Sequence, residues 1–236
     1  MTKVIIVGVG GPSCSGKTTA AKTLHSLFKG SLLIHEDDFY FSDTQIPFDE
    51  AKGEQDWDCP EALNFTQFLQ ALAEIRQNGE LLEEIASLEP DVKLLVSASE
   101  VAEISARIQQ AFPPHKYKFV FVDGFMLYHD PVIVNSLDIR LFLHASYATL
   151  KQRREGREAY ITKEGTWQDP PGYFDKMVWP AYEKSHKHLF VNNDTAGRLT
   201  EEAKSGLSIK DCATDKVGLF QIITWAVTEI LGSLEK

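Results

Sequence analysis

Short continuous apolar runs alternate along the chain with segments in which apolar residues recur at helical spacing. The continuous runs are rich in β-branched and aromatic residues and lie at 4–9, 32–35, 119–122, 139–143 and 189–191. Strands that are buried on both faces of a parallel sheet have this composition. The helical segments lie at 18–28, 61–78, 147–157, 174–189 (with a break near Pro180) and 220–231. Strands that alternate with helices predict an α/β fold with a central parallel sheet flanked by helices.

Other segments follow neither pattern. Polar residues, Gly and Pro predict loops at 43–60 and 162–172. We interpret 79–117 as a peripheral insertion, in which Ile104 and Ile108 suit a short helix or strand. The length of 236 residues predicts one compact domain over 1–236, because single hydrophobic cores stop growing near ~250 residues.

The charge balance limits the classes of partner. The chain has 24 Lys and Arg against 34 Asp and Glu, a net charge of −10, which argues against a nucleic-acid-binding face. A small anion can still bind at a local basic site. Cys14, Cys59 and Cys212 form no CxxC pair, so neither a zinc site nor a disulfide framework is indicated. Because no apolar run reaches the ~18 residues of a membrane span, we expect a cytoplasmic protein that contacts no membrane.

The strongest chemical signal follows the first predicted strand. Residues 11–18 match G-x-x-x-x-G-K-[ST], and with Thr19 they give the predicted ATP-binding residues Gly11, Pro12, Ser13, Cys14, Ser15, Gly16, Lys17, Thr18 and Thr19. The glycines let backbone N–H groups surround phosphate oxygens, and the following helix adds its positive end. Lys17 can reach the β- and γ-phosphates, and the Thr18 hydroxyl can bind Mg²⁺. The pattern predicts a three-layer P-loop NTPase fold that uses ATP and Mg²⁺.

Asp123 directly follows the strand predicted at 119–122. A P-loop enzyme needs an acid at such a place to hold Mg²⁺ directly or through water, although a lone strand-end Asp is more often a turn or cap residue. Switch GTPases share the phosphate loop and also need an Asn-Lys-x-Asp segment, but the Asn-Asn-Asp at 192–194 lacks the lysine. A kinase of a small molecule is therefore favoured over a switch.

Candidate acceptor-binding residues follow the predicted strands at the same edge of the sheet. Glu36, Asp37 and Asp38 come directly after the strand at 32–35. Clustered carboxylates repel one another unless a cation or a ligand compensates, and helix capping is the alternative role for each. Trp57, between two acids in a polar loop, is either a packing anchor or a stacking platform.

The segment 151–157 (KQRREGR) is basic in an otherwise acidic protein. A charge run is usually a solvated helix face. In a phosphoryl-transfer enzyme, however, its arginines can close over the phosphates and neutralise transition-state charge. We predict a small arginine-bearing lid at about 151–166, in which Tyr160 offers a second aromatic face.

Together these residues resemble nicotinamide riboside kinases, which belong to the uridine-kinase-like group of P-loop kinases. The matching segments span roughly 1–65 and 118–190, and they are GPSCSGKTT (11–19), HEDDFY (35–40), DWDCPEALNF (56–65), VDGFMLY (122–128), KQRREGR (151–157) and DPPGYFDKMVWPAY (169–182). The phosphate loop alone is generic. The DDFY, WD-x-PEAL and DPPGYFD segments in this order are much more specific.

The resemblance implies transfer of the γ-phosphoryl group of ATP to the 5′-hydroxyl of nicotinamide riboside, with nicotinic acid riboside as a second possible acceptor. The product is the mononucleotide used for NAD synthesis. The resemblance implies that Asp37 and Lys17 are catalytic, that Thr18 and Asp37 bind Mg²⁺, and that Asp123 holds this ion through water. The implied acceptor-binding residues are Asp37, Asp38, Phe39, Tyr40, Trp57, Asp58, Arg154 and Tyr160, and the implied lid residues on the ATP phosphates are Arg153 and Arg157.

Within that implied set, Asp58 and Arg154 hold the ribose hydroxyls, and Trp57 and Tyr160 sandwich the nicotinamide ring. The chemistry agrees, because a cationic pyridinium is attracted to aromatic faces by ~0.5–2 kcal/mol. Vicinal hydroxyls suit a carboxylate that accepts and an arginine that donates. The sequence departs from the family in that Asp123 stands where many relatives carry Glu, and Glu158-Ala159 lengthens the link to Tyr160.

Two alternatives stay open at this point. The same scaffold serves kinases of uridine, cytidine, pantothenate or phosphoribulose, which a panel of acceptors distinguishes. A non-catalytic nucleotide-binding regulator is the alternative from another class, and the presence of both Lys17 and Asp37 gives it no support.

Overall fold

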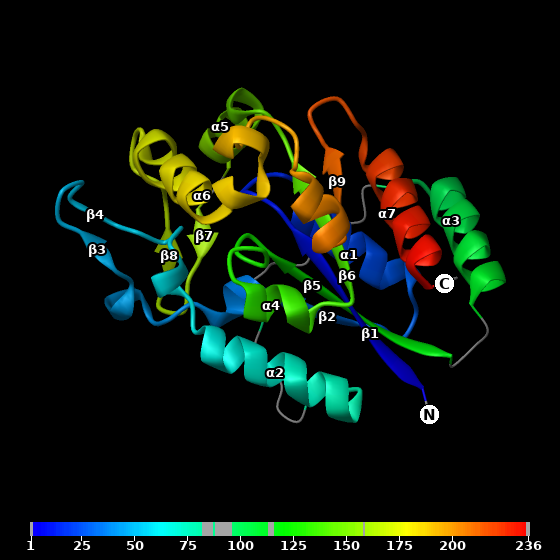
Figure 1. Cartoon of the computed structure of the whole chain (residues 1–236). Helices are drawn as coiled ribbons and strands as arrows, with labels where there is room; N and C mark the ends of the chain where they lie inside the picture. Colours follow the sequence, from blue (N-terminus) through cyan, green and yellow to red (C-terminus); the bar gives the residue numbers. More distant parts are fainter. Residues whose placement is uncertain (1, 82–86, 88–95, 113–115, 158, 235–236) are drawn as a thin grey trace.

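The computed structural model describes residues 2–81, 87, 96–112, 116–157 and 159–234 (Figure 1). In these residues, five parallel strands form the central sheet in the order β2-β5-β1-β6-β9. The sheet strands are β1 (Lys3–Gly10), β2 (Leu32–His35), β5 (Tyr117–Gly124), β6 (Ile139–His144) and β9 (Ile209–Ala213). Because all of them run in parallel, their carboxyl ends meet at one edge, which lies away from the two chain termini in Figure 1.

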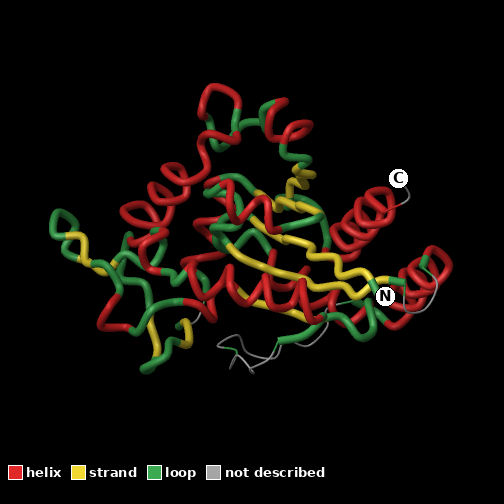
Figure 2. Tube along the Cα trace, turned by 60° about the horizontal axis from the view of Figure 1, so that its bottom comes forward, coloured by secondary structure: helices red, strands yellow, loops and turns green. Residues whose placement is uncertain are grey.

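Helices cover both faces of this sheet (Figure 2). They are α1 (Lys17–Leu27), α2 (Phe65–Asn78), α3 (Ala98–Ala111), α4 (Pro131–Ser136), α5 (Tyr147–Glu155), α6 (Trp179–His186) and α7 (Leu219–Leu234). The segment 11–16 links β1 to α1, which is the arrangement that the phosphate-loop motif requires. The prediction of a three-layer P-loop fold is confirmed.

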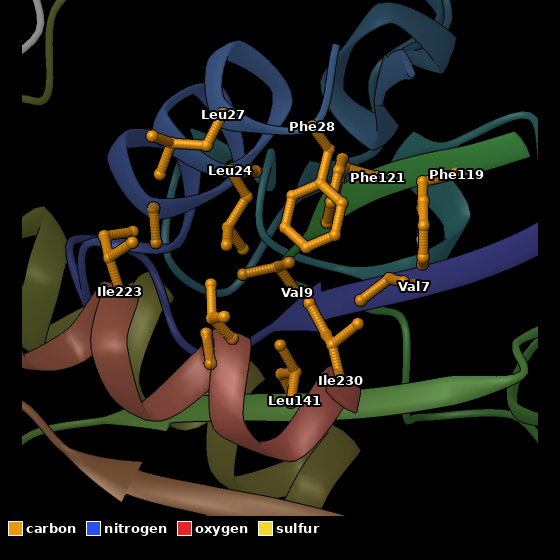
Figure 3. Packing of buried hydrophobic residues seen from close by; sticks show 14 of the residues in the cluster. Val7, Val9, Leu24, Leu27, Phe28, Phe119, Phe121, Leu141, Ile223 and Ile230 are labelled. Atoms are coloured by element: carbon orange, nitrogen blue, oxygen red, sulfur yellow. The ribbon is translucent and has the colours of Figure 1, made fainter. Parts of the chain in front are cut away.

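The alternation of side chains along β1 separates two cores. Val7 and Val9 point toward α1 and α7, where they pack against Leu24 and Ile230 (Figure 3). Ile6 points to the other face and belongs to the cluster that includes α2 and α4. Since successive residues of a strand face opposite sides, a strand buried on both faces is apolar throughout, as the run at 4–9 is.

One strand prediction is wrong, and one strand was not predicted. The segment 189–191 is not a strand. The chain there forms the 3-10 helices η5 (Lys187–Leu189) and η6 (Val191–Asn193), and Phe190 makes only an isolated bridge to Leu199. The fifth strand of the sheet is instead β9, in a region where we predicted no strand. It escaped prediction because this edge strand is partly exposed and carries Lys210 and Asp211.

Helix α2 begins later than predicted. Pro60–Ala62 forms the separate 3-10 helix η3, and α2 begins after Asn64, whose side chain accepts a hydrogen bond from the Gln67 N–H at 3.1 Å. The helix predicted at 174–189 changes type at its centre: Phe174–Val178 is a π-helix (η4), and α6 starts just before Pro180. The proline fits there because the first turn of an α-helix needs no donor from it.

Helix α3 lies within the segment 79–117 that we interpreted as an insertion. A capping box of Ser97 and Glu100 starts this helix. Ile104 and Ile108 then bury themselves in the core with α1 and α7, since residues four apart share one helix face. The parts of the predicted insertion at 82–86, 88–95 and 113–115 lie outside the described residues.

The segments predicted as loops at 43–60 and 162–172 contain short pairs of strands. Strand β3 (Phe48–Asp49) pairs with β4 (Glu54–Gln55), and β7 (Tyr160–Ile161) pairs with β8 (Thr166–Trp167). Both hairpins lie beyond the carboxyl edge of the sheet (Figure 1). Among the described residues, no helix combines the length and the apolar character that crossing a bilayer needs.

Candidate active site

The phosphate loop has a backbone that only glycine permits at two points. Gly11 and Gly16 have φ values of 146° and 94°, in a region that other residues rarely adopt. A Cβ atom on Gly11 would lie 1.9 Å from the carbonyl oxygen of Leu143. The loop therefore lies tightly against the end of β6, with its N–H groups available for an anion at the start of α1.

A cavity of about 610 Å³ opens beside this loop at the carboxyl edge of the sheet. The described residues that line it are Ser13, Lys17, Thr18, Asp37, Tyr40, Phe41, Trp57, Asp58, Phe125, Arg154, Arg157, Ala159, Tyr160, Ile161, Thr162, Lys163 and Trp167. One end is cationic and belongs to the phosphate loop, and the other is aromatic. The cavity thus brings together ten of the residues predicted for ATP or acceptor binding.

Thr18 and Asp123 meet at the base of the phosphate loop. The Thr18 hydroxyl donates to Oδ2 of Asp123 at 2.6 Å, and the ring of His35 hydrogen-bonds Oδ1 through Nδ1. Burial alone would raise the pKa of Asp123. The hydrogen bond and the charge of His35 lower this pKa, as do the hydrogen bond from Thr18 and the charge of Lys17. Asp123 is therefore an ionised carboxylate held in place from both sides.

His35 was not predicted as a site residue. It ends β2 and lies directly opposite Asp123 in the parallel register of β2 and β5. The signal was present in the sequence, since both residues end buried strands, but it becomes visible only when these strands are known to be neighbours.

The turn after β2 carries the predicted catalytic acid. The 3-10 helix η1 (Glu36–Phe39) starts at the strand end and places Asp37 in the cavity wall. Its neighbour Glu36 is fully buried, and its Oε2 accepts the Met126 N–H at 2.9 Å. Burial raises the pKa of Glu36 to about 8. A Cβ on Gly124 would lie 2.5 Å from the same carboxylate, so Glu36 packs tightly under the site.

Arg154 is the centre of a buried polar network. Its guanidinium donates to Asp169 at 2.6 and 3.0 Å and to the Ser13 hydroxyl at 2.7 Å, and it faces Asp58 at 3.5 Å. Arg154 and Asp58 are 7% and 5% exposed. Burial raises the pKa of Asp58 to about 6, although the charge of Arg154 opposes that rise. The network joins the phosphate loop to the acceptor end of the cavity.

Aromatic rings form the acceptor end. The ring centroid of Trp57 lies 5.5 Å from that of Tyr40 and 5.6 Å from that of Trp167. Tyr160 stacks under the guanidinium groups of Arg157 and Arg154, at 4.0 and 4.5 Å from its centroid. Trp57 and Tyr160 line the same cavity, as the resemblance implied, although Glu158 of the lengthened link lies outside the described residues.

Several predicted residues do not line this cavity. Phe39 is buried in the core against Phe68, at a centroid distance of 5.2 Å, because the turn of η1 directs it away from the cavity. Asp38 is absent from the described lining, as are the loop residues Gly11, Pro12, Cys14, Ser15, Gly16 and Thr19. The loop residues form the backbone of the phosphate loop beside the cavity, where the Ser15 carbonyl, for example, accepts a hydrogen bond from the Thr214 hydroxyl at 3.0 Å.

Arg153 lies behind the phosphate loop and outside the described cavity lining. Its guanidinium donates to the Cys14 carbonyl at 3.2 Å and to the Thr214 carbonyl at 3.1 Å. It thereby ties the loop to the chain after β9. The two adjacent arginines of α5 therefore have different partners, because Arg154 contacts Ser13, Asp58 and Asp169.

The donors near the loop suit Mg²⁺ that is bound together with phosphate. In kinases Mg²⁺ takes one or two carboxylates and keeps its other positions for phosphate and water. Thr18, Asp123 and Asp37 supply a hydroxyl and carboxylates of this kind. Among the described residues, no group of three or more His, Cys, Asp and Glu side chains forms a protein-only metal site.

The chain is similar in sequence to known proteins over most of its length. A nicotinamide riboside kinase of Schizosaccharomyces pombe is 44% identical over 234 residues, which cover 99% of both chains. One of Saccharomyces cerevisiae is 37% identical over 97% of this chain and 96% of its own. One of Eremothecium gossypii is 40% identical over 83% and 81%. No family model matches the chain.

Proposed function

The chain belongs to the nicotinamide riboside kinase family, and from this premise we propose that it transfers the γ-phosphoryl group of ATP to the 5′-hydroxyl of nicotinamide riboside. The product is the mononucleotide that serves NAD synthesis. The observation that carries the proposal is one cavity in which Lys17 and Thr18 of the phosphate loop face the Asp58–Arg154 pair and Trp57. The relatives' names support this acceptor over uridine or cytidine.

Residues of the loop and of the predicted lid bind the phosphates of ATP in this proposal. The loop N–H groups surround the β-phosphate, and Lys17, which is 8% exposed, balances the charge of the γ-phosphate. Arg157 reaches into the cavity from the chain after α5. Arg153 acts as a positioning residue, because it holds the Cys14 carbonyl and contacts the loop from behind.

Thr18, Asp37 and Asp123 are the residues that would hold Mg²⁺. The ion, when bound, neutralises charge on the β- and γ-phosphates. Asp123 already accepts a hydrogen bond from Thr18 and is kept ionised by His35. These two contacts keep the Thr18 hydroxyl and the carboxylate together at the loop before nucleotide arrives.

Asp37 acts on the acceptor hydroxyl. It lines the same cavity as the phosphate-loop residue Lys17 and the ribose-binding pair. As the 5′-oxygen bonds to the γ-phosphorus, the bond from this phosphorus to the β–γ bridging oxygen breaks and ADP leaves. The proton of the 5′-hydroxyl passes to the Asp37 carboxylate.

The ribose and the base are held by separate groups. The ribose hydroxyls donate to the remaining lone pairs of Asp58, and they accept from Arg154 in place of its two long hydrogen bonds to Asp58, which measure 3.5 Å. Trp57 and Tyr160 provide faces for the cationic ring. The carboxylates of Asp58 and Asp37 also attract this cation.

The test is identification of the product. Purified protein is incubated with Mg²⁺, ATP and nicotinamide riboside, and the product is examined by mass spectrometry and ³¹P NMR. We expect ADP and a 5′-phosphomonoester of the riboside in equal amounts. ATP hydrolysis without a phosphorylated riboside would contradict the proposal.

A further inference from the structure

We propose that the β7–β8 hairpin closes the acceptor end of the cavity, and that its Trp167 is a specificity-determining residue that gives the cationic ring an additional aromatic face. This inference rests on the proposed function and concerns a residue outside the predicted site. It is carried by the contacts of the hairpin on both sides of the cavity.

One side of the hairpin is fastened to the segment after η1. The Thr162 hydroxyl donates to Oδ2 of Asp43 at 2.7 Å and accepts the Gly165 N–H at 3.0 Å. The ammonium group of Lys163 donates to the carbonyl oxygen of Tyr40. The tip of the hairpin is therefore held against the chain that carries Tyr40 and Phe41, which themselves line the cavity.

On the other side of the hairpin, Trp167 packs against aromatic residues of the cavity wall and core. Its ring lies 5.6 Å from Trp57, at an interplanar angle of 43°, and 5.6 Å from Tyr173. Trp167 is only partly buried and lines the cavity. It pairs with Tyr160 across the hairpin, so the two strands bring two aromatic residues to the acceptor end beside Trp57. Several aromatic faces around one site are a known means of binding cations.

Trp167 also contacts the ribose-binding network. Its indole Nε1 donates to Oδ1 of Asp169 at 2.9 Å, and Asp169 accepts two hydrogen bonds from Arg154. The residue thus has two separable properties: the aromatic face, and the N–H group that orients Asp169. A phenylalanine keeps the first property and loses the second, whereas a leucine loses both.

The experiment compares two acceptors that differ in ring charge. Nicotinamide riboside carries a cationic ring, and its 1,4-dihydro form has the same ribose and amide on a neutral ring. We expect Trp167→Leu to raise the KM for the cationic riboside about tenfold, which corresponds to ~1.4 kcal/mol. The KM for the neutral form should change less than about threefold, and the KM for ATP should stay constant. Trp167→Phe should have an intermediate effect on the cationic riboside.

Phe48→Leu is the matched control. Phe48 is 55% exposed on the other short hairpin, outside the described cavity lining, and this variant should keep all three KM values. An unchanged thermal midpoint and ATP KM show that Trp167→Leu is folded.

Equal losses for both ribosides, or no change in either KM, would overturn the role of the aromatic face. Equal effects of Phe and Leu would also overturn it and leave only the Asp169 contact. If wild-type protein phosphorylates neither riboside, the proposed function itself fails. That result is distinct from an active enzyme that is insensitive to Trp167.

Discussion

The two ends of the cavity are built in opposite ways. The phosphate end comes from one continuous segment, 11–18, whose shape depends on Gly11 and Gly16 and on close packing against Leu143. The acceptor end comes from separate segments that contribute Asp37, Trp57, Asp58, Arg154 and Trp167. A generic nucleotide site can therefore be encoded locally, while selectivity for the acceptor depends on tertiary contacts that join distant parts of the chain.

Asp37 is the proposed proton acceptor of the reaction, so its substitution should have the largest effect. We expect Asp37→Asn to lower kcat by about 10²- to 10⁴-fold, because the acceptor hydroxyl loses its proton acceptor. The KM for ATP should change little. Steady-state kinetics with both substrates varied measures this, and the matched variant Asp38→Asn, at the adjacent carboxylate outside the described lining, should stay within about threefold of wild type. Near-normal turnover of Asp37→Asn would remove Asp37 from the role of base.

The ionisation of Asp58 should make riboside binding at the acceptor end depend on pH. Burial raises the pKa of Asp58 to about 6, so the carboxylate is ionised above that pH and protonated below it. A protonated Asp58 loses its charge attraction for the cationic riboside and part of its acceptor capacity. At pH 5 only about a tenth of it is ionised, and we expect the KM for the riboside to rise about tenfold relative to pH 7.

Asp58→Asn provides the control for this pH dependence. Its KM for the riboside should already be high at pH 7 and should stay nearly constant down to pH 5. A wild-type profile that persists in the variant would assign the titration to another group.

Arg153 should have the smallest effect, confined to the phosphate end. Arg153→Ala removes hydrogen bonds to the carbonyls of Cys14 and Thr214, each worth about 1 kcal/mol. We expect the KM for ATP to rise about fivefold while the KM for the riboside is unchanged. An equal change in both KM values would show that the two ends are not separate in the way their contacts indicate.

The contrast also explains which features could be predicted from the sequence. The strands at 4–9 and 119–122 were predictable because burial on both faces makes them apolar throughout, and the edge strand β2 was predictable because Leu32, Leu33 and Ile34 are apolar. The phosphate loop was predictable because its chemistry requires fixed residues at fixed spacing. Strand β9 was not predictable, since exposed Lys210 and half-buried Asp211 interrupt the apolar pattern of this edge strand.

Within the site, the residues that sequence reasoning missed act through tertiary contacts. His35 meets Asp123 only through the register of β2 and β5. Trp167 reaches Trp57 only through the β7–β8 hairpin, in a segment that its Gly and Pro content predicted to be loop. Phe39 was assigned to the acceptor site with its neighbours, but the turn of η1 sends it into the core. The order of the motifs predicted which segments form the site. The directions of individual side chains could be seen only in the structure.

The measurement that tests the central claim most directly is kcat/KM for a panel of acceptors at fixed Mg²⁺ and ATP. The panel contains nicotinamide riboside, nicotinic acid riboside, uridine and cytidine. The account predicts that nicotinamide riboside exceeds uridine and cytidine by at least about tenfold, because only the pyridinium ring gains from the aromatic, carboxylate-lined end of the cavity. Uridine or cytidine equal to or better than nicotinamide riboside would contradict it.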